Sequence, residues 1–379
     1  MINSRKDILH SVKKVVIKIG SGVLTTEDGL NLDVIMALSE EICHLTEERR
    51  VEVILVSSGA IASGIKKMGF SQRPQSISQQ QAAAAIGQSS LMLAYEEVFK
   101  KFGRKVAQVL VTRDDLTNRR RYLNTRNTLF TLLNWKVIPI INENDTVVVD
   151  EIKFGDNDNL SAMIANLAGA DLVVNLTTTD GFFDDDPRRN SNAHLISLVE
   201  KITSGMEKKA SSVPGSLGRG GMESKIQAAR HAAMCGIPTI IANGLKSDII
   251  SRIFEGKEEG TLFLPQPIPM KRRKHWIAFT KSPKGRIMVD KGAEDAILNK
   301  GKSLLPSGII AVYGRFNVGN SVVIINKEEE VLAAGLVNYH STDIEKIMGR
   351  KTSEIEKTLG FKHDDEVIHK DNLVLMNNH

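Results

Sequence analysis

The chain has 379 residues, of which 41% are hydrophobic and 25% charged, and its formal net charge is +5. This length predicts two or three domains, and this composition excludes a disordered or fibrous protein. The chain has only two cysteines, Cys43 and Cys235, which excludes a disulfide framework and a cysteine-rich zinc site. No run approaches the ~18 consecutive apolar residues of a membrane span. Lys18 interrupts the apolar run at 15–19, so we expect a cytoplasmic protein without a signal peptide.

Residues 1–265 alternate between strand-like and helix-like segments. Short, nearly continuous apolar runs predict strands buried on both faces, at 15–19, 51–56, 106–111, 137–141, 172–176 and 239–242. Helical spacing of apolar residues predicts helices at 33–46, 79–100, 118–133, 160–168 and 222–235. The alternation predicts an α/β domain with a mostly parallel sheet sandwiched by helices. Ligands of such sheets bind beyond the carboxyl ends of the strands, so the loops that follow strands are the candidate site.

The pattern changes at the proline-rich segment 265–269, which predicts a stiff linker at 266–274. Short strands separated by glycine turns then predict a small β-rich domain at 275–365, followed by a tail at 366–379. From residue 271 onward there are 18 Lys and Arg against 14 Asp and Glu, including Lys271-Arg272-Arg273-Lys274. With Trp276, this basic run suits phosphate contact and stacking on RNA, although a solvated linker explains it more simply.

Two of the loops that follow strands suit anions. Lys18 ends the first strand and is followed by Gly20-Ser21-Gly22, which places a positive charge beside accessible backbone N–H groups. Its spacing matches neither the Walker A pattern nor GxGxxG. The segment Ser57-Ser58-Gly59-Ala60 runs from the second strand into a helix, whose start suits a carboxylate or phosphate. An ordinary serine cap also explains this second loop.

The most polar loop follows the predicted strand at 137–141. It contains Asn142-Glu143-Asn144-Asp145, and a second polar cluster, Gly155-Asp156-Asn157-Asp158-Asn159, opens the next helix. A turn accounts for two or three such residues, but not for two clusters separated by a strand-like stretch at 147–154. Such side chains hold an ammonium group, orient a carboxylate, or keep lysines and Mg²⁺ in place. The calcium pattern of an EF-hand does not fit.

A glycine-rich segment precedes the last predicted helix of this part. Four glycines within residues 215–221 lead into a helix that carries Lys225, a pattern that suits a polyphosphate cradle or a flexible surface loop. Together, the four loops predict phosphoryl transfer, which needs positioning and charge neutralisation rather than a protein nucleophile. No Ser-His-Asp order or activated cysteine stands out. Two lysines from distant segments would converge on the transferring phosphoryl group.

This combination of motifs resembles the glutamate 5-kinases of the amino acid kinase family. The matching segments are VIKIGS at 16–21, VSSGAI at 56–61, INEND at 141–145, GDNDNLSA at 155–162 and GGMxxK at 220–225. The C-terminal part resembles a PUA domain, through IMVD at 287–290, Gly292-Ala293 and GKSLLPSGI at 301–309. The resemblance covers nearly the whole chain.

The resemblance implies phosphorylation of the γ-carboxylate of L-glutamate by ATP with Mg²⁺, the first step of proline biosynthesis. It implies that Lys18 and Lys225 contact ATP and stabilise the transferring phosphoryl group, while Asp158 orients these lysines. It places glutamate against Ser58, Asp145 and Asn157, with Gly59, Asn142 and Asp156 nearby. The implied nucleotide site is lined by Lys18, Gly20, Ser21, Thr177, Thr178, Arg219, Gly220, Gly221, Met222, Glu223, Ser224 and Lys225. It implies no metal site built by the protein itself.

Two departures from the family pattern fall in the implied nucleotide site. Thr177-Thr178 stands where the family commonly has Thr-Asp, and Arg219 stands where it has Thr. The resemblance further implies a homo-oligomer, inhibition by proline, delivery of the product to glutamyl phosphate reductase, and RNA binding by the PUA-like domain. The alternatives are an amino acid kinase for N-acetylglutamate, aspartate or carbamate, and an RNA-binding protein whose kinase part is vestigial. Asp145 argues against an acetylated substrate, because its carboxylate suits a free ammonium group.

Overall fold

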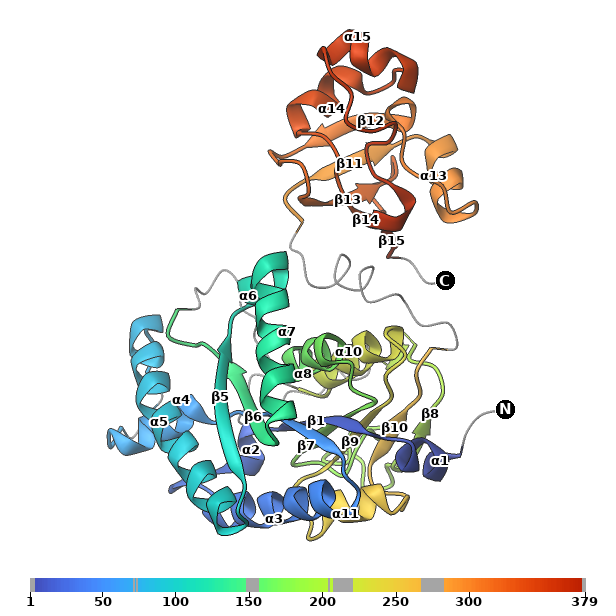
Figure 1. Cartoon of the computed structure of the whole chain (residues 1–379). Coiled ribbons are helices and arrows are strands. Elements are labelled where there is room, and N and C mark those ends of the chain that lie inside the picture. The colour runs from blue at the N-terminus through green and yellow to red at the C-terminus, as the bar shows by residue number, and fades with distance from the viewer. Residues whose placement is uncertain are drawn as a thin grey trace. The chain divides into compact units, whose positions relative to one another are not determined.

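The structure is a computed structural model that describes residues 4–70, 72, 74–147, 157–203, 205–206, 221–266 and 283–376. The chain divides into two compact units, Met1–Pro269 and Met270–His379. Each unit has its own sheet and its own hydrophobic core (Figure 1). Among the helices described, none combines the length and the apolar character that a bilayer crossing requires.

The first unit is built on an eight-stranded sheet. Its strands are β1 (Lys14–Ile19), β4 (Glu52–Val56), β5 (Lys105–Val111), β6 (Val137–Glu143), β7 (Leu172–Thr177), β8 (Leu198–Val199), β9 (Thr239–Asn243) and β10 (Thr261–Phe263). They lie in the order β5-β6-β4-β1-β7-β9-β10-β8. The strands from β5 to β9 are parallel, whereas β10 runs antiparallel to β9 and parallel to β8. The predicted mostly parallel sheet and its six predicted strands are confirmed, and β8 and β10 are additional.

Helices cover both faces of this sheet (Figure 1). On one face lie α3 (Leu32–Glu48) and α11 (Ile249–Phe254), and on the other lie α7 (Arg119–Asn134), α8 (Asn157–Ala168) and α10 (Met222–Met234). Two helices pack against each other beside the sheet, α4 (Ala60–Lys67) and α5 (Ile77–Lys101). The shorter elements are α1 (Arg5–His10), α2 (Ser21–Leu24), α6 (Arg113–Thr117), and a hairpin of β2 (Thr25–Thr26) and β3 (Gly29–Leu30). The five predicted helices are confirmed, although α8 begins three residues earlier than expected.

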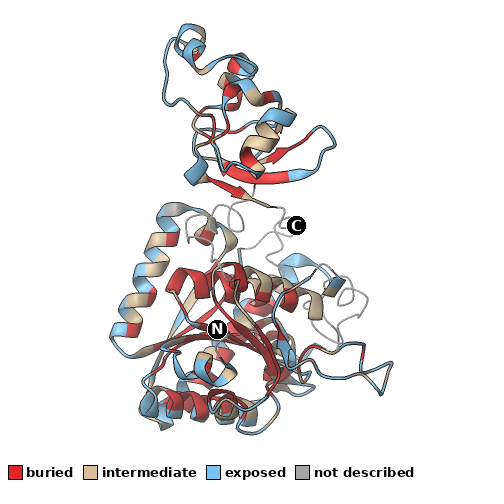
Figure 2. Cartoon of the chain, turned by 90° about the vertical axis from the view of Figure 1, so that its right-hand side faces the viewer, coloured by how far each residue is buried: buried red, intermediate tan, exposed pale blue. Residues whose placement is uncertain are grey.

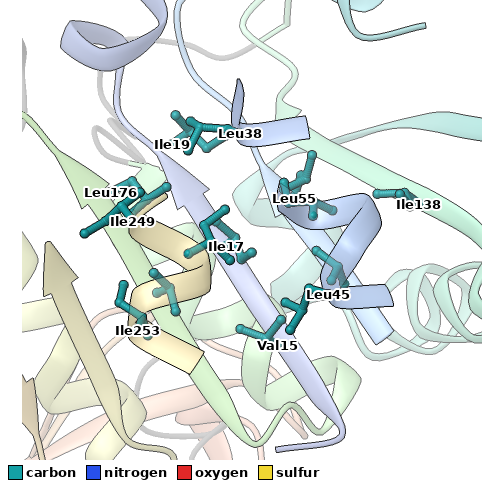
Figure 3. Packing of buried hydrophobic residues seen from close by; sticks show 14 of the residues in the cluster. Val15, Ile17, Ile19, Leu38, Leu45, Leu55, Ile138, Leu176, Ile249 and Ile253 are labelled. Atoms are coloured by element: carbon teal, nitrogen blue, oxygen red, sulfur yellow. The ribbon is translucent and has the colours of Figure 1, made fainter. Parts of the chain in front are cut away.

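The central strand β1 sorts its side chains between the two faces of the sheet. Val15, Ile17 and Ile19 are each at most 1% exposed and pack with Leu38 of α3 and Ile249 of α11 (Figure 3). Successive side chains of a strand point to opposite faces, so Lys18 lies on the other face, the side of α8 and α10. Figure 2 shows the sheet as a buried layer. The strand therefore presents one buried cation to one face only.

Two glycines allow α4 and α5 to approach each other closely. A Cβ atom on Gly64 would lie 1.8 Å from the carbonyl oxygen of Ala83, and one on Gly87 would lie 1.8 Å from that of Ala60. Any side chain at these positions would therefore push the helices apart. Because α4 begins directly after the loop that follows β4, this approach brings α5 close to that loop.

The second unit is built on a five-stranded sheet in the order β12-β11-β13-β14-β15. Its strands are β11 (Arg286–Val289), β12 (Ile309–Tyr313), β13 (Ser321–Ile325), β14 (Val331–Leu336) and β15 (Leu373–Leu375). Its helices are α13 (Lys291–Leu298), α14 (Ser341–Ile347) and α15 (Ile355–Leu359). The core includes Ile287, Val322 and Tyr339, each fully buried. The predicted β-rich second domain is confirmed.

One predicted boundary of the second unit is wrong. The sequence suggested a separate tail from residue 366, but Leu373 pairs with Gly335 and Leu375 pairs with Ala333 across the sheet. Leu373 and Val374 are at most 5% exposed, so this short apolar segment is part of the second unit and not a tail after it. The basic run at 271–274 and Trp276 lie outside the described residues.

Candidate active site

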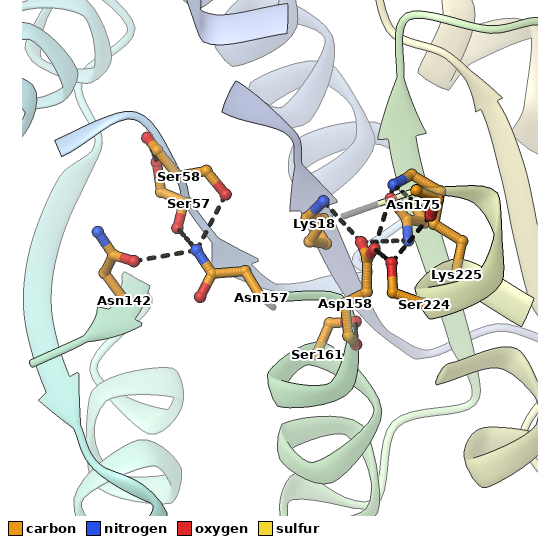
Figure 4. A network of polar contacts seen from close by, with 11 residues as sticks. Lys18, Ser57, Ser58, Asn142, Asn157, Asp158, Ser161, Asn175, Ser224 and Lys225 are labelled. Carbon is orange, nitrogen blue, oxygen red and sulfur yellow. Dashed lines mark hydrogen bonds and ion pairs between the residues drawn. The ribbon is translucent and has the colours of Figure 1, made fainter. Parts of the chain in front are cut away.

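Three charged side chains meet at the carboxyl end of β1. Nζ of Lys18 lies 2.6 Å from Oδ1 of Asp158, and Nζ of Lys225 lies 3.1 Å from Oδ2 of the same carboxylate (Figure 4). Lys18 is 4% exposed, Lys225 6%, and Asp158 is fully buried. Two ammonium groups thus share one carboxylate, which leaves an excess positive charge where water screens it little. Such a cluster attracts an anion.

Within the part of the chain that the structure describes, four hydrogen-bond donors lie against the carboxylate of Asp158. In addition to the two lysines, Asn175 Nδ2 donates to Oδ1 at 2.8 Å and Ser224 Oγ donates to Oδ2 at 2.8 Å. A carboxylate offers about four acceptor positions, so these donors occupy it. Asp158 is therefore placed to hold the two lysines, and not to remove a proton from a substrate.

Three segments that are distant in the sequence position this charged cluster. Lys18 of β1 is in register with Asn175 of β7, so both side chains rise from the same face of the sheet. Asp158 lies in the first turn of α8, where the helix dipole favours a negative charge. Lys225 lies in the first turn of α10, and its Nζ reaches back to within 3.4 Å of the carbonyl oxygen of Gly221. The convergence lies at the carboxyl edge of the sheet, as expected for this fold.

A second cluster, made of uncharged polar groups, lies at the ends of β4 and β6. Asn157 Nδ2 donates to the carbonyl oxygen of Ser57 at 2.7 Å, to Ser58 Oγ at 2.9 Å and to Asn142 Oδ1 at 3.1 Å (Figure 4). Asn142 is 2% exposed and Ser57 is fully buried. We call Ser57, Ser58, Asn142 and Asn157 the amide cluster, and Lys18, Asp158, Asn175, Ser224 and Lys225 the charged cluster.

The first turn of α8 joins the two clusters. Asn157 belongs to the amide cluster, and its neighbour Asp158 belongs to the charged cluster (Figure 4). Consecutive residues of a helix point about 100° apart, so two neighbours reach two adjacent sites. Ser161 Oγ donates to the carbonyl oxygen of Asp158 at 2.6 Å and stabilises this turn. Any movement of the start of α8 therefore moves both clusters together.

The expected nucleotide-site residues at the ends of β1 and β7 lie beside Lys18. A Cβ atom on Gly20 would lie 3.6 Å from Lys18 Nζ and 3.2 Å from the carbonyl oxygen of Leu176. A Cβ atom on Gly22 would lie 3.0 Å from Cγ2 of Thr178, so α2, which Ser21 opens, packs against the segment after β7. Thr177 is the last residue of β7.

Other predicted site residues lie at the edges of the two clusters or outside the described chain. Gly59 caps α4 with a φ of +92°, directly after Ser58. Asp145 lies half-buried in the turn after β6. Met222 and Glu223 open α10. The predicted residues Asp156, Arg219 and Gly220, and most of the strand-like stretch at 147–154, lie outside the described residues. Within the described chain, no group of three His, Cys, Asp or Glu side chains is arranged to hold a metal ion.

Sequence reasoning missed several residues of this site. Asn175 carried a usable signal, because it is a polar residue in the middle of an apolar strand. In the structure it is in register with Lys18 and lies on the same face of the sheet. Gln88 carried no such signal, since it lies in an alanine-rich helix, and it accepts a hydrogen bond from Asn142 Nδ2 at 2.8 Å. Tyr95 OH lies 3.1 Å from Ser57 Oγ. Contacts that join a helix to a distant loop have no local pattern in the sequence.

Comparison with known proteins assigns a class to this fold and site. The model of the amino acid kinase family matches residues 13–243, and that of the PUA domain matches residues 285–359. The first match contains every element that carries the two clusters. The class is therefore a kinase domain of the amino acid kinase type followed by a PUA domain.

The chain is also similar to curated proteins over nearly its full length. The glutamate 5-kinase of Geobacter metallireducens is 54% identical over 373 residues, covering 98% of this chain and 100% of that protein. The glutamate 5-kinase of Syntrophotalea carbinolica is 51% identical over 371 residues, covering 98% and 99%. Among solved structures, the UMP kinase from Ureaplasma parvum is 17% identical, with a TM-score of 0.47, covering 67% of this chain and 99% of that one. The chain belongs to the glutamate 5-kinase family.

Proposed function

We propose that this chain transfers the γ-phosphoryl group of Mg·ATP to the γ-carboxylate of L-glutamate, which gives glutamyl 5-phosphate and ADP. This reaction is the first step of proline biosynthesis from glutamate. The observation that carries the proposal is the buried Lys18–Asp158–Lys225 cluster, joined through α8 to a neutral polar cluster. The similarity to proteins named glutamate 5-kinase supports glutamate as the acceptor.

The charged cluster suits the transfer step. An oxygen of the substrate carboxylate bonds to the γ-phosphorus while the bond from phosphorus to ADP breaks. Carboxylic acids are ionised at neutral pH, so the acceptor needs no general base, in keeping with an Asp158 carboxylate whose oxygens already hold four donors. An ammonium group carries its positive charge whatever its hydrogen-bond partners are, and both lysines share the single negative charge of Asp158. The positive charges of Lys18 and Lys225 stabilise the charge that develops on the phosphoryl oxygens.

The amide cluster and its surroundings suit the amino acid. The amide nitrogen of Asn157 faces three protein oxygens, so its carbonyl oxygen Oδ1 points away from them and is placed to accept from an ammonium group. We assign Asp145 to the same ammonium group. Ser58 and the backbone N–H groups at the start of α4 suit a carboxylate. Asn142 is almost fully buried and contributes by holding Asn157.

Mg²⁺ enters with ATP as part of that substrate. Gly20, Ser21, Thr177, Thr178 and the segment 219–225 line the nucleotide. Binding of proline, self-association, delivery of the product to a reductase, RNA binding by the PUA domain and a cytoplasmic location stay predictions. The alternative acceptors are N-acetylglutamate, aspartate and carbamate. Acetylation removes the positive charge that Asp145 and Asn157 Oδ1 would recognise.

Trapping of the acyl phosphate tests this proposal directly. Hydroxylamine converts an acyl phosphate to a stable hydroxamate, so the purified chain with Mg·ATP and glutamate should give a hydroxamate, and N-acetylglutamate should give little. Aspartate and carbamate are assayed in parallel. Equal rates with glutamate and its acetylated form, or activity only with the latter, contradict the proposed substrate.

A further inference from the structure

Helix α5 places two buried polar side chains behind the amide cluster. Gln88 is 9% exposed and Tyr95 is 1% exposed. They are seven residues apart, close to two full turns, so they lie on the same face of the helix. Their neighbours on the buried side of α5 include Ala84, Leu91 and Phe99. A buried polar group costs free energy unless it is hydrogen-bonded. The Gln88 oxygen is bonded to Asn142 near the end of β6, and the Tyr95 hydroxyl to Ser57 in the loop after β4.

Two backbone groups determine how the amide side chains are oriented. The Glu143 N–H can only donate, and it donates to Asn142 Oδ1 at 2.9 Å, so the oxygen of this amide must face it. The carbonyl oxygen of Ser57 can only accept, and it accepts from Asn157 Nδ2 at 2.7 Å. Asn142 Nδ2 therefore points to Gln88 Oε1, 2.8 Å away. The order of donors and acceptors from Gln88 through Asn142 to Asn157 is thus determined by the protein backbone.

Tyr95 stabilises the other side of the same cluster. Its hydroxyl group lies 3.1 Å from Ser57 Oγ, and the Ser57 N–H donates to the carbonyl oxygen of Ile141 at 2.8 Å. Burial raises the pKa of the Tyr95 phenol, so the group is uncharged at neutral pH. Ser57 precedes Ser58, and its carbonyl oxygen accepts from Asn157 Nδ2. The position of Tyr95 therefore affects Ser58 and Asn157, the two side chains that we assign to the acceptor substrate.

We infer that Gln88 and Tyr95 are positioning residues, through which α5 orients Asn157 and Ser58 for the acceptor amino acid. This inference rests on the proposed function, because it assumes that the amide cluster binds the acceptor. Gln88 acts by holding Asn142, which in turn holds Asn157. If Gln88 lost its acceptor oxygen, Asn142 Nδ2 would lose its only hydrogen bond among the described residues. Asn142 would then be held only through its Oδ1, by the Glu143 N–H and Asn157 Nδ2, and would position Asn157 less firmly.

The test is steady-state kinetics of Gln88→Met and Tyr95→Phe, with Leu91→Met as the control. Leu91 is fully buried on the same helix and belongs to the apolar core, so its substitution perturbs packing without removing a polar contact. Gln88→Met removes the acceptor at similar volume, and Tyr95→Phe removes only the hydroxyl group. We expect KM for glutamate to rise about tenfold in Gln88→Met and about threefold in Tyr95→Phe, the usual range for one lost hydrogen bond. KM for ATP should change less than about twofold, as should all parameters of Leu91→Met.

A double-mutant cycle shows whether Gln88 acts through Asn157. In an Asn157→Ala background, Gln88→Met should raise KM for glutamate less than about twofold further, because the group that it positions is gone. Gln88→Glu keeps an acceptor oxygen and should restore KM partly. Thermal unfolding confirms that each variant is folded. An unchanged glutamate KM in folded Gln88→Met and Tyr95→Phe, an equal rise in both KM values, or full additivity with Asn157→Ala overturns the inference. A wild-type chain inactive on glutamate would instead contradict the proposed function.

Discussion

The charged cluster and the amide cluster meet at the first turn of α8, yet one consists of ionised groups and the other mainly of uncharged ones. In the charged cluster, ionised groups lie 2.6 and 3.1 Å apart in a buried place, and the sum of their charges is positive. In the amide cluster, uncharged groups are connected in one direction by hydrogen bonds that end on backbone atoms. The first arrangement neutralises charge on a reacting phosphoryl group, and the second arrangement fixes direction for a ligand that must be oriented.

This difference assigns the clusters to different steps of the reaction. Charge on the phosphoryl oxygens rises in the transition state, so the lysines act mainly on kcat. The ammonium and carboxylate groups of an amino acid do not change during the transfer, so groups that hold them act equally on the ground state and the transition state, and appear in KM. Substitutions in the two clusters should therefore separate kinetically.

Substitution of the lysines should have the largest effect. We expect Lys18→Ala and Lys225→Ala each to lower kcat by about 10²–10³-fold, because each removes a donor from the charge that develops at the phosphoryl group. KM for glutamate should change little. Hydroxamate formation at saturating glutamate and ATP measures the effect.

Lys246 provides a matched control for the lysine variants. It lies outside both clusters and pairs with Asp180 at 3.2 Å, with its side chain 38% exposed, so Lys246→Ala should keep a kcat close to that of the wild type. If Lys225→Ala retained full kcat, the start of α10 would not be the phosphate site, and the comparison between the clusters would fail.

Substitutions at Asn157 of the amide cluster and at the nearby Asp145 should have a smaller effect, and on KM rather than on kcat. Asn157→Ala removes three hydrogen bonds within the protein and the acceptor proposed for the ammonium group. Asp145→Ala removes the carboxylate proposed for the same group. We expect KM for glutamate to rise about 10–100-fold in each, with KM for ATP within about threefold, because these contacts exist before transfer begins.

Asn157→Ala and Asp145→Ala test whether the groups assigned to glutamate act on its KM and not on kcat. Isothermal titration calorimetry should give the same Kd for a non-hydrolysable ATP analogue in Asn157→Ala and in the wild type. A variant that loses kcat while its glutamate KM stays constant would show that the amide cluster takes part in transfer, and the assignment of the two clusters to different steps would be wrong.

The sequence named the members of both clusters except Asn175, but it did not reveal the residues of α5 behind the amide cluster, for a physical reason. Lys18 interrupts a buried strand and Asp158 lies in a dense polar run, and both are anomalies against a regular apolar pattern. Their meeting follows from the rule that the carboxyl ends of parallel strands share one edge. The strand order, by contrast, has no signal in the sequence, because the neighbours β1 and β7 are separated by a long stretch of chain that carries no pairing pattern.

The parts that the sequence did not predict depend on tertiary contact. Gln88 and Tyr95 match the helical pattern of α5 as ordinary buried residues, and only the close approach allowed by Gly64 and Gly87 brings that helix to the amide cluster. Likewise, β15 is three residues long, and its place in the second sheet depends on pairing with β14 rather than on its own pattern.

Removal of the second unit should have the smallest effect of the three changes. Both clusters lie between Lys18 and Lys225, within the unit that ends at Pro269. That unit has a core of its own, with Ile17, Ile42 and Phe254 fully or almost fully buried, and a chain of about 270 residues is long enough to fold alone. The boundary between the units follows the proline-rich segment 265–269, the kind of segment that commonly separates domains able to fold alone.

We therefore expect a chain ending at Pro269 to retain kcat within about threefold of the full-length protein, because the groups that act on the transferring phosphoryl are all present. Circular dichroism and thermal unfolding confirm that the shortened chain is folded before its kinetics are compared. Under the same conditions, KM for glutamate reports on the amide cluster and KM for ATP on the nucleotide side. A loss of kcat of about a thousandfold in a folded chain would mean that the second unit supplies a group to the charged cluster. A rise confined to the glutamate KM would mean instead that the second unit acts on the amide cluster alone. The kinetics of this one truncation therefore show which of the two clusters, if either, depends on the second unit.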